Sequence, residues 1–172
     1  AKVSVEHHNA SKAAQILDNI HIDIEGSASM VSAKTQIANT SGKNKNMELD
    51  IDYTINMPRS ASVNLTNSFG DIYLDKCEGP VTIKLSYGNL DSRILTHEQT
   101  SVTMSFSEGN IEKMLMGDLR LRYSELKIGQ ADKCNIDSQF SELKITKANN
   151  LLFTSKYDEI DISSINNCTI DA

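Results

Sequence analysis

Apolar and polar residues alternate along much of the chain with the period of two that is typical of β-strands. Ile20, Ile22 and Ile24 share one face of the first such stretch. The longest stretch covers residues 47–57, where apolar side chains occupy the odd positions and polar ones the even positions. Pro58 ends it, because proline cannot donate to a strand ladder. This stretch predicts a half-buried strand with one face in water.

The remainder of the first sixty residues predicts short elements. In chain order they are a strand around Val3 and Val5, a helix or a loop over 11–18, a turn over 26–29, a strand over 31–38 and a loop over 40–46. The adjacent His7 and His8 suggest a metal ion, but no carboxylate or cysteine lies at ligand spacing, so two exposed polar residues are the better interpretation.

One phrase recurs six times between residues 69 and 162: aromatic, small or polar, acidic or amide, aliphatic, any residue, aliphatic. The aromatic residues are Phe69, Tyr87, Phe106, Tyr123, Phe140 and Tyr157, spaced by 17 to 19 residues. A fixed period of this size is typical of stacked-repeat folds. The copy from Phe106 to Lys113 is longer, and we expect two extra residues at its corner, with a bulge at Gly109.

Aligning the copies produces further apolar columns. Four residues before each aromatic stand Leu65, Ile83, Val102, Leu119, Ile136 and Phe153; after it stand Ile72, Leu90, Ile111, Leu126, Leu143 and Ile160. Stacked in parallel at ~4.8 Å, equivalent residues would pile on one another. We therefore predict an all-β protein, a single-stranded right-handed parallel β-helix with 17–18-residue rungs, in which the six aromatics form an internal ladder.

The expected organisation is a single domain over residues 1–172, with residues 1–60 capping the repeats of residues 61–172. The net charge of −6 argues against nucleic acid or an anionic membrane as the partner. No apolar run is long enough to span a membrane. The chain opens on Ala1 without a methionine, which leaves room for a removed export signal. It stops at Ala172, two residues before the next expected aromatic, so we expect either a chain cut inside a rung or a different cap. An unprotected strand edge there predicts an end-to-end homodimer.

The chain contains three cysteines, Cys77, Cys134 and Cys168, and none belongs to a CxxC pair. Cys134 and Cys168 fall in one inward column with Leu151 on the rung between them. They would then lie about 9.6 Å apart, too far for a disulfide. We expect buried small hydrophobic residues, and the alternative is a reactive thiol.

One polar column follows the aromatics and is expected to form an exposed ladder: Asp71, Asn89, Asn110, Glu125, Glu142 and Glu159. Carboxylates at ~5 Å repel one another. Lys127 and Lys144 lie two residues beyond two of the glutamates, so mutual compensation is the favoured interpretation, and a calcium or ligand strip is the alternative. We expect no cofactor and no metal.

No sequence motif for catalysis is present. The nearest candidate group is Asp91, Arg93, Asp118, Arg120 and Arg122, and each of these also fits an outward position on an alternating strand. No histidine joins them, so no catalytic residue is assigned.

The stretch Tyr53-Thr-Ile-Asn-Met-Pro58 followed by Phe69-Gly-Asp-Ile-Tyr-Leu74 resembles a bacterial adhesin-domain family. These are uncharacterised β-helix repeat proteins common in gut Bacteroidetes and related to the head domain of autotransporter adhesins. The resemblance covers residues 20–172 and lies in a strand ending at proline and in Gly-Asp or Gly-Asn corners. It implies an exported protein, periplasmic, at the outer surface or secreted, and no catalytic residue.

The repeat thus predicts a surface rather than a reaction. We expect a non-catalytic, secreted or cell-surface, adhesin-like module that binds a surface glycan or a protein. The alternative is a carbohydrate-active β-helix enzyme, a polysaccharide lyase or hydrolase. A third interpretation is a scaffold unit of a larger envelope protein.

Overall fold

The computed structural model describes residues 1–7, 10–27, 29–38 and 47–171. The chain divides into two compact units, Ala1–Asn56 and Met57–Ala172. The expectation of one domain, in which residues 1–60 cap the repeats, stays a prediction.

Within its described residues, the first unit combines one short helix with two antiparallel strand pairs. The elements are β1 (Lys2–His7), α1 (Ala10–Asp18), β2 (Ile20–Gly26), β3 (Val31–Ile37) and β4 (Met47–Asp52). β1 pairs with β4, and β2 pairs with β3. The predicted strand at Val3 and Val5, the helical alternative for 11–18 and the strand over 31–38 are confirmed. The expected loop over 40–46 lies outside the described residues, as do the side chains of His7 and His8.

The predicted strand over 47–57 is wrong in its second half. β4 ends at Asp52, which pairs with Lys2, and the β1 ladder continues no further. Tyr53, Ile55 and Met57 keep the alternating pattern but are exposed. Alternation alone therefore overstates the strand, because a ladder needs a partner for every residue as well as a suitable sequence.

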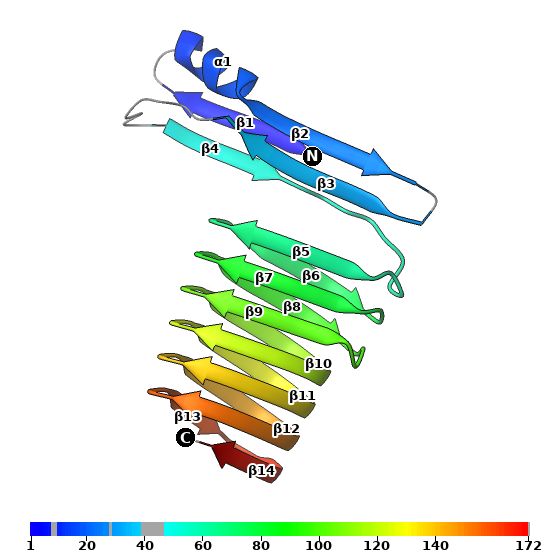
Figure 1. Cartoon of the computed structure of the whole chain (residues 1–172), viewed down its shortest axis with the longest axis vertical. Helices are drawn as coiled ribbons and strands as arrows, with labels where there is room; N and C mark the ends of the chain where they lie inside the picture. The colour runs from blue at the N-terminus through cyan, green and yellow to red at the C-terminus, as the bar shows by residue number, and fades with distance from the viewer. Residues whose placement is uncertain (8–9, 28, 39–46, 172) are drawn as a thin grey trace. The chain divides into compact units, whose positions relative to one another are not determined.

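The second unit is a β-solenoid of about six coils with ~17 residues each (Figure 1). Its strands are β5 (Val63–Ser68), β6 (Ile72–Cys77), β7 (Val81–Ser86), β8 (Asn89–Leu95), β9 (Thr100–Ser105), β10 (Glu108–Arg122), β11 (Glu125–Gln139), β12 (Glu142–Lys156), β13 (Glu159–Ile162) and β14 (Ile165–Asp171). All of their pairings are parallel. The chain advances as a right-handed coil, so the predicted fold class is confirmed.

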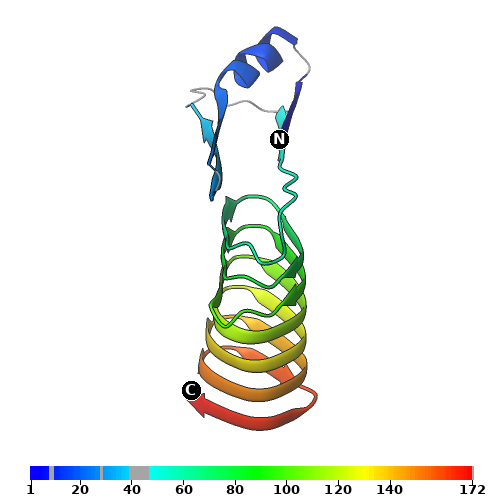
Figure 2. The ribbon, with the colours of Figure 1, turned by 90° about the vertical axis from the view of Figure 1, so that its right-hand side faces the viewer.

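Each coil is flattened and contributes one strand or half-strand to each of two parallel sheets (Figure 2). One sheet contains β5, β7 and β9, followed by the second halves of β10, β11 and β12 and by β14; the other contains β6, β8, the first halves of the same long strands, and β13. The 15-residue strands bend from one sheet into the other at the return corner, which we define as the side where each coil passes into the next.

The uneven period comes from this return corner and not from the copy at Phe106. Residues 78–80 and 96–99 form the first two returns, whereas residues 115–116 suffice in the next coil. Glu108 and Gly109 pair in register with Glu125 and Leu126. The predicted two-residue insertion and the bulge at Gly109 are therefore wrong. The described glycine with a positive φ is Gly117, at 148°, and not Gly109. A Cβ at Gly117 would lie 2.4 Å from the carbonyl oxygen of Thr100.

The core consists of stacked apolar columns between the two sheets. The column from Leu65 to Phe153 is confirmed in register, coil by coil. In the second predicted column Gly109 takes the place given to Ile111, which instead stacks on Ile128. Burying these side chains is the main stabilising term, at roughly 25 cal/mol per Å² of apolar surface.

The six aromatics do not form an internal ladder. Their side chains point outward, with exposed fractions from 41% at Phe140 to 79% at Phe69. Each has a left-handed backbone, with φ between 51° and 64°. This conformation interrupts the alternation, so the residues two before and three after the aromatic, such as Leu85 and Leu90, both face the core. The residue directly after the aromatic takes the narrow inner corner, where only glycine, serine or aspartate occurs.

We predict that glycine at position 106 destabilises the second unit about 1 kcal/mol less than alanine does. Both substitutions remove the ring and its two neighbour contacts, but only glycine adopts φ near 52° without strain. Urea unfolding followed by circular dichroism measures the difference. Tyr73, an exposed aromatic on β6, is the matched control, because an extended strand favours alanine over glycine. The same order at both positions would contradict this account of the corner.

Candidate functional site

The most unusual surface of the second unit is a stack of six aromatic rings along one corner, called here the ring stack. It comprises Phe69, Tyr87, Phe106, Tyr123, Phe140 and Tyr157. Neighbouring ring centroids lie 4.9 to 5.1 Å apart, with planes inclined by 2° to 10°. Parallel in-register strands dictate this spacing. The rings therefore cover one another's faces and leave edges and tyrosine hydroxyls in water.

The backbone N–H groups of this aromatic corner donate hydrogen bonds to the neighbouring coils. The aromatic N–H donates to a carbonyl of the next coil, as from Phe106 to Arg122 (3.0 Å), and the acidic residue's N–H donates back to the preceding coil, as from Glu125 to Ser107 (3.0 Å). Between them runs a serine ladder: the N–H groups of Ser107 and Ser124 each donate to the next serine Oγ at 3.2 Å. Sequence reasoning missed this ladder, although the small residue after every aromatic is its signal.

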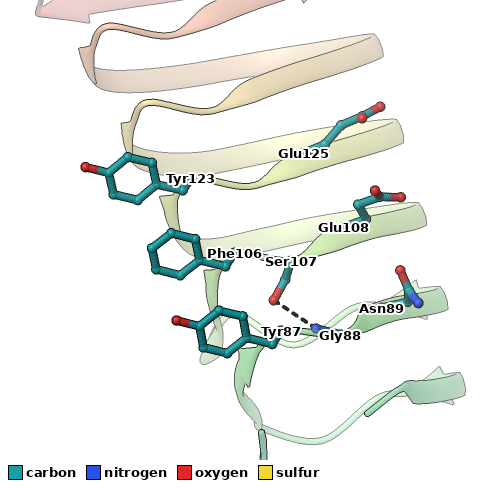
Figure 3. A pocket seen from close by; sticks show the side chains of 8 residues that line it. All are labelled: Tyr87, Gly88, Asn89, Phe106, Ser107, Glu108, Tyr123 and Glu125. Atoms are coloured by element: carbon teal, nitrogen blue, oxygen red, sulfur yellow. Dashed lines mark hydrogen bonds between the residues drawn. The ribbon is translucent and has the colours of Figure 1, made fainter. Parts of the chain in front are cut away.

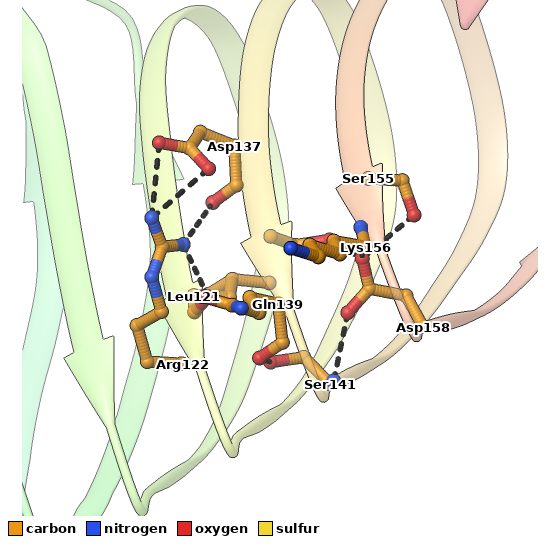
Figure 4. Close-up of polar contacts among 9 residues, drawn as sticks. Leu121, Arg122, Asp137, Gln139, Ser141, Ser155, Lys156 and Asp158 are labelled. Atoms are coloured by element: carbon orange, nitrogen blue, oxygen red, sulfur yellow. Dashed lines mark hydrogen bonds and ion pairs between the residues drawn. The ribbon is translucent and has the colours of Figure 1, made fainter. Parts of the chain in front are cut away.

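Asp158 ends the serine ladder (Figure 4). Its carboxylate accepts from the Ser141 N–H (2.8 Å), the Lys156 N–H (2.9 Å), and the hydroxyls of Ser138 and Ser155 (2.6 Å each). Partial burial by itself would raise the pKa of Asp158, but the hydrogen bonds outweigh it, and the net pKa lies below the ordinary value.

Beside the ring stack runs an acidic row on the outer side of the same corner. The row consists of Asp71, Asn89, Glu108, Glu125, Glu142 and Glu159, which follow one another in register. The prediction that Asn110 belongs to it is wrong, because Asn110 stacks on Lys127 and donates to Asp91. Glu108 takes its place, because the copy at Phe106 contains no extra residues and Glu108 pairs in register with Glu125. The other five predicted members are confirmed as one column.

The expected lysine compensation occurs at two positions of the acidic row. Lys127 contacts Glu125 at 2.8 Å, and Lys144 contacts Glu142. The hydrogen bond from Lys127 and its charge lower the pKa of Glu125. Glu108 and Glu159 make no ion pair with any residue that the structure describes. Asp71 likewise forms no ion pair with a described residue, whereas the charge of Lys144 also acts on Glu159. The row therefore keeps a surplus of negative charge.

A shallow groove, called here the corner groove, lies between the ring stack and the acidic row (Figure 3). Two hollows compose it. The first is lined by Tyr87, Gly88, Asn89, Phe106, Ser107, Glu108, Tyr123 and Glu125, and the second by Tyr123, Ser124, Glu125, Phe140, Ser141, Glu142, Tyr157 and Glu159. Because both include Tyr123 and Glu125, the groove is continuous along the solenoid. At its floor Gly88 has no room for a side chain, since a Cβ would lie 2.0 Å from the Gly70 carbonyl oxygen.

The candidate catalytic group is not brought together. Asp91 and Arg93 lie on β8 in one sheet, whereas Asp118, Arg120 and Arg122 lie on the second half of β10 in the other. Their partners are structural: Arg93 pairs with Asp75, and Arg122 binds both carboxylate oxygens of Asp137 at 3.1 Å (Figure 4). These five residues therefore supply no shared site for acid–base chemistry.

In the part of the chain that the structure describes, no cluster of three or more histidine, cysteine, aspartate or glutamate side chains is placed to hold a metal ion. No described helix is long and apolar enough to cross a membrane.

The cysteines occupy the predicted columns, but only two are buried. Cys134 stacks on Leu151 and Leu151 on Cys168, as expected. Burial, with the charges of Asp132 and Asp118, raises the pKa of Cys134 to about 12. Burial also raises the pKa of Cys77. Cys168 is exposed, like most of β14, and its expected burial is wrong.

Comparison with family models, curated proteins and solved structures finds no match for this chain. The resemblance to bacterial adhesin domains accordingly stays a prediction. What the structure establishes is the β-solenoid, its ring stack and the corner groove beside it.

We predict that replacing Asp158 by asparagine removes a pH-dependent part of the stability. Because its folded-state pKa lies below the unfolded one, Asp158 adds stability above about pH 3.9, and this contribution is lost as pH falls through the folded-state pKa. The free energy of unfolding of the wild-type chain should exceed that of the variant by about 1 kcal/mol near neutral pH, since solvent screens this partly exposed group. The difference should shrink as the pH falls below about 3.9 and through the folded-state pKa. Urea unfolding across this range measures the gap. Glu159→Gln is the exposed control; a similar gap for both variants would contradict the role of Asp158.

We predict that a thiol reagent labels one cysteine of the native chain. Cys168 is exposed, whereas burial and a raised pKa protect Cys77 and Cys134, since the thiolate is the reactive form. Labelling with 5,5′-dithiobis(2-nitrobenzoate) at about pH 8, with and without denaturant, counts the reactive thiols. Rapid labelling of native Cys168→Ser would contradict the burial of the other two.

Proposed function

We propose that this chain is a non-catalytic, adhesin-like binding module that engages its partner through the corner groove. The observation that supports this most strongly is the ring stack, because six large aromatic side chains stay exposed in one contiguous strip. Contiguous exposed apolar surface on a soluble domain is typical of interaction sites. Aromatic residues also contribute large contact areas with little loss of conformational freedom on binding.

The choice of residue at the corner supports a role beyond the fold. Glycine would adopt the left-handed backbone without strain, yet the six φ values between 51° and 64° all belong to phenylalanine or tyrosine. Stacking offsets part of this strain, at about 0.5–1.5 kcal/mol for each pair of rings. The rings also determine what the corner presents to water, which glycine would not do.

The setting that we propose is outside the cytoplasm: the periplasm, the outer surface or the secreted fraction of a bacterium. It rests on the resemblance described above. The partner that we propose is a surface glycan or a protein.

We predict that binding depends on the ring stack. A variant with Tyr87→Gly, Phe106→Gly and Tyr123→Gly removes three rings while keeping a residue that suits the corner backbone. Binding is measured on a glycan array and on immobilised mucin, fibronectin and collagen, with circular dichroism as the check on folding. The wild-type chain should bind at least one of these probes, and the variant should lose that binding.

Tyr73→Ala is the matched control, because Tyr73 is an exposed aromatic of the same unit outside the ring stack. It should bind like the wild-type chain. Binding that survives loss of the three rings, or binding to none of the probes, contradicts the proposal. Release of reducing ends from any polysaccharide would instead favour the enzyme alternative.

A further inference from the structure

We infer that the corner groove is a binding site for elongated, planar aromatic cations, held with their long axis parallel to the solenoid axis. This uses the groove of the proposed function, but it names a ligand class that needs no macromolecular partner. The geometry of the two walls and of the floor leads to it.

The ring wall favours a flat π-system. Because the planes of neighbouring rings are inclined by only 2° to 10°, their faces are occupied by one another. What lines the groove is a row of ring edges, with hydroxyl groups only at the tyrosines. A planar ligand lying along the row makes van der Waals contact with the edge of each ring that it passes.

The carboxylate wall favours positive charge. The two hollows are lined by Glu108, Glu125, Glu142 and Glu159, and lysines compensate the two in the middle. Glu108 and Glu159, one in each hollow, form no ion pair with a described residue, although the charge of Lys144 also acts on Glu159 from a longer distance. A bound cation would relieve the repulsion between neighbouring carboxylates in addition to making its own ion pair.

The floor disfavours anions. An anion needs N–H or O–H donors, but the corner N–H groups already donate to neighbouring coils. The inward serine hydroxyls are engaged as well: those of Ser107 and Ser124 each donate to a backbone carbonyl at 2.8 Å. The floor therefore offers van der Waals contact without free donors.

The length of the groove fits an extended ligand. From Tyr87 to Tyr157 the stack makes four centroid steps of 4.9 to 5.1 Å, so the wall extends about 20 Å. No side chain larger than serine interrupts the floor from Gly88 to Ser141. A rigid ligand of two or three fused or linked rings can contact several ring edges at once.

Thioflavin T, a long flat monocation, is the probe, and Congo red, a long flat dianion, is its counterpart. We expect thioflavin T to bind the monomeric chain with increased fluorescence that weakens as salt is added. Equilibrium dialysis should find no uptake of Congo red. Because thioflavin T also reports fibrils, the fluorescence must co-elute with the monomer in size-exclusion chromatography.

Two sets of variants locate the site. Glu108→Gln and Glu159→Gln should each weaken thioflavin T binding by roughly threefold, the loss expected for one exposed ion pair. Phe106→Gly combined with Tyr123→Gly should weaken it roughly tenfold. The controls Glu112→Gln and Tyr73→Ala alter an exposed carboxylate and an exposed aromatic outside the groove and should leave binding unchanged.

Absence of thioflavin T binding, a signal confined to aggregates, equal uptake of Congo red, or binding unaffected by the groove variants would each overturn the inference. The glutamine variants keep the test decisive if the glycine variant fails to fold. The proposed function can fail separately. Ring-dependent binding on the arrays without thioflavin T binding would leave the module intact and remove this ligand class, and the converse would retain only the small-molecule site.

Discussion

Each coil of the solenoid turns on one residue held in the left-handed region, with φ between 51° and 64°. That backbone costs an L-residue about 1–2 kcal/mol, and here it recurs at all six aromatic corners. It shifts the side-chain alternation by one position, so that apolar residues face inward in both sheets. The inner corner then has room only for a small residue, and the large side chain must point into water. Ring exposure is thus a geometric consequence of how the coil closes.

In-register stacking converts this local conformation into extended surfaces. Because each coil contacts only its neighbours, a residue type at one corner is repeated at ~4.8 Å intervals along the axis. For the rings this repetition is favourable, since each strained residue gains two stacking partners except at the ends of the row. For the glutamates it is unfavourable, since like charges adjoin. Lys127 and Lys144 offset that repulsion by forming ion pairs with Glu125 and Glu142. Glu108 and Glu159 form no ion pair with a described residue.

Much of this fold could be predicted from the sequence, because the repeat period and the apolar columns directly reflect parallel stacking. The outward direction of the aromatic side chains could not be predicted from the sequence. Alternation fixes the direction of side chains only within a strand and does not apply to a residue whose φ is positive. Leu85 and Leu90 lie five apart and both face the core, which alternation alone cannot explain. The small residue after each aromatic, which is glycine, serine or, in the last copy, aspartate, is the available signal. The place of Asn110 could not be predicted for a different reason: Gly109 occupies the column that is aliphatic in the other five copies, so the pattern points to Ile111 as the next aliphatic.

Some features of the corner groove are required for the coil to close, and others are not. Closure of the coil requires a left-handed corner and an outward side chain, but glycine would meet that need. Stacking offsets part of the strain of an aromatic residue in place of glycine, at about 0.5–1.5 kcal/mol per pair. Neither effect accounts for a second wall of carboxylates, where packing demands nothing and charge repulsion opposes them. The acidic row, more than the exposed rings, is thus the feature that the stability of the fold does not explain. Binding of a positively charged ligand would account for it.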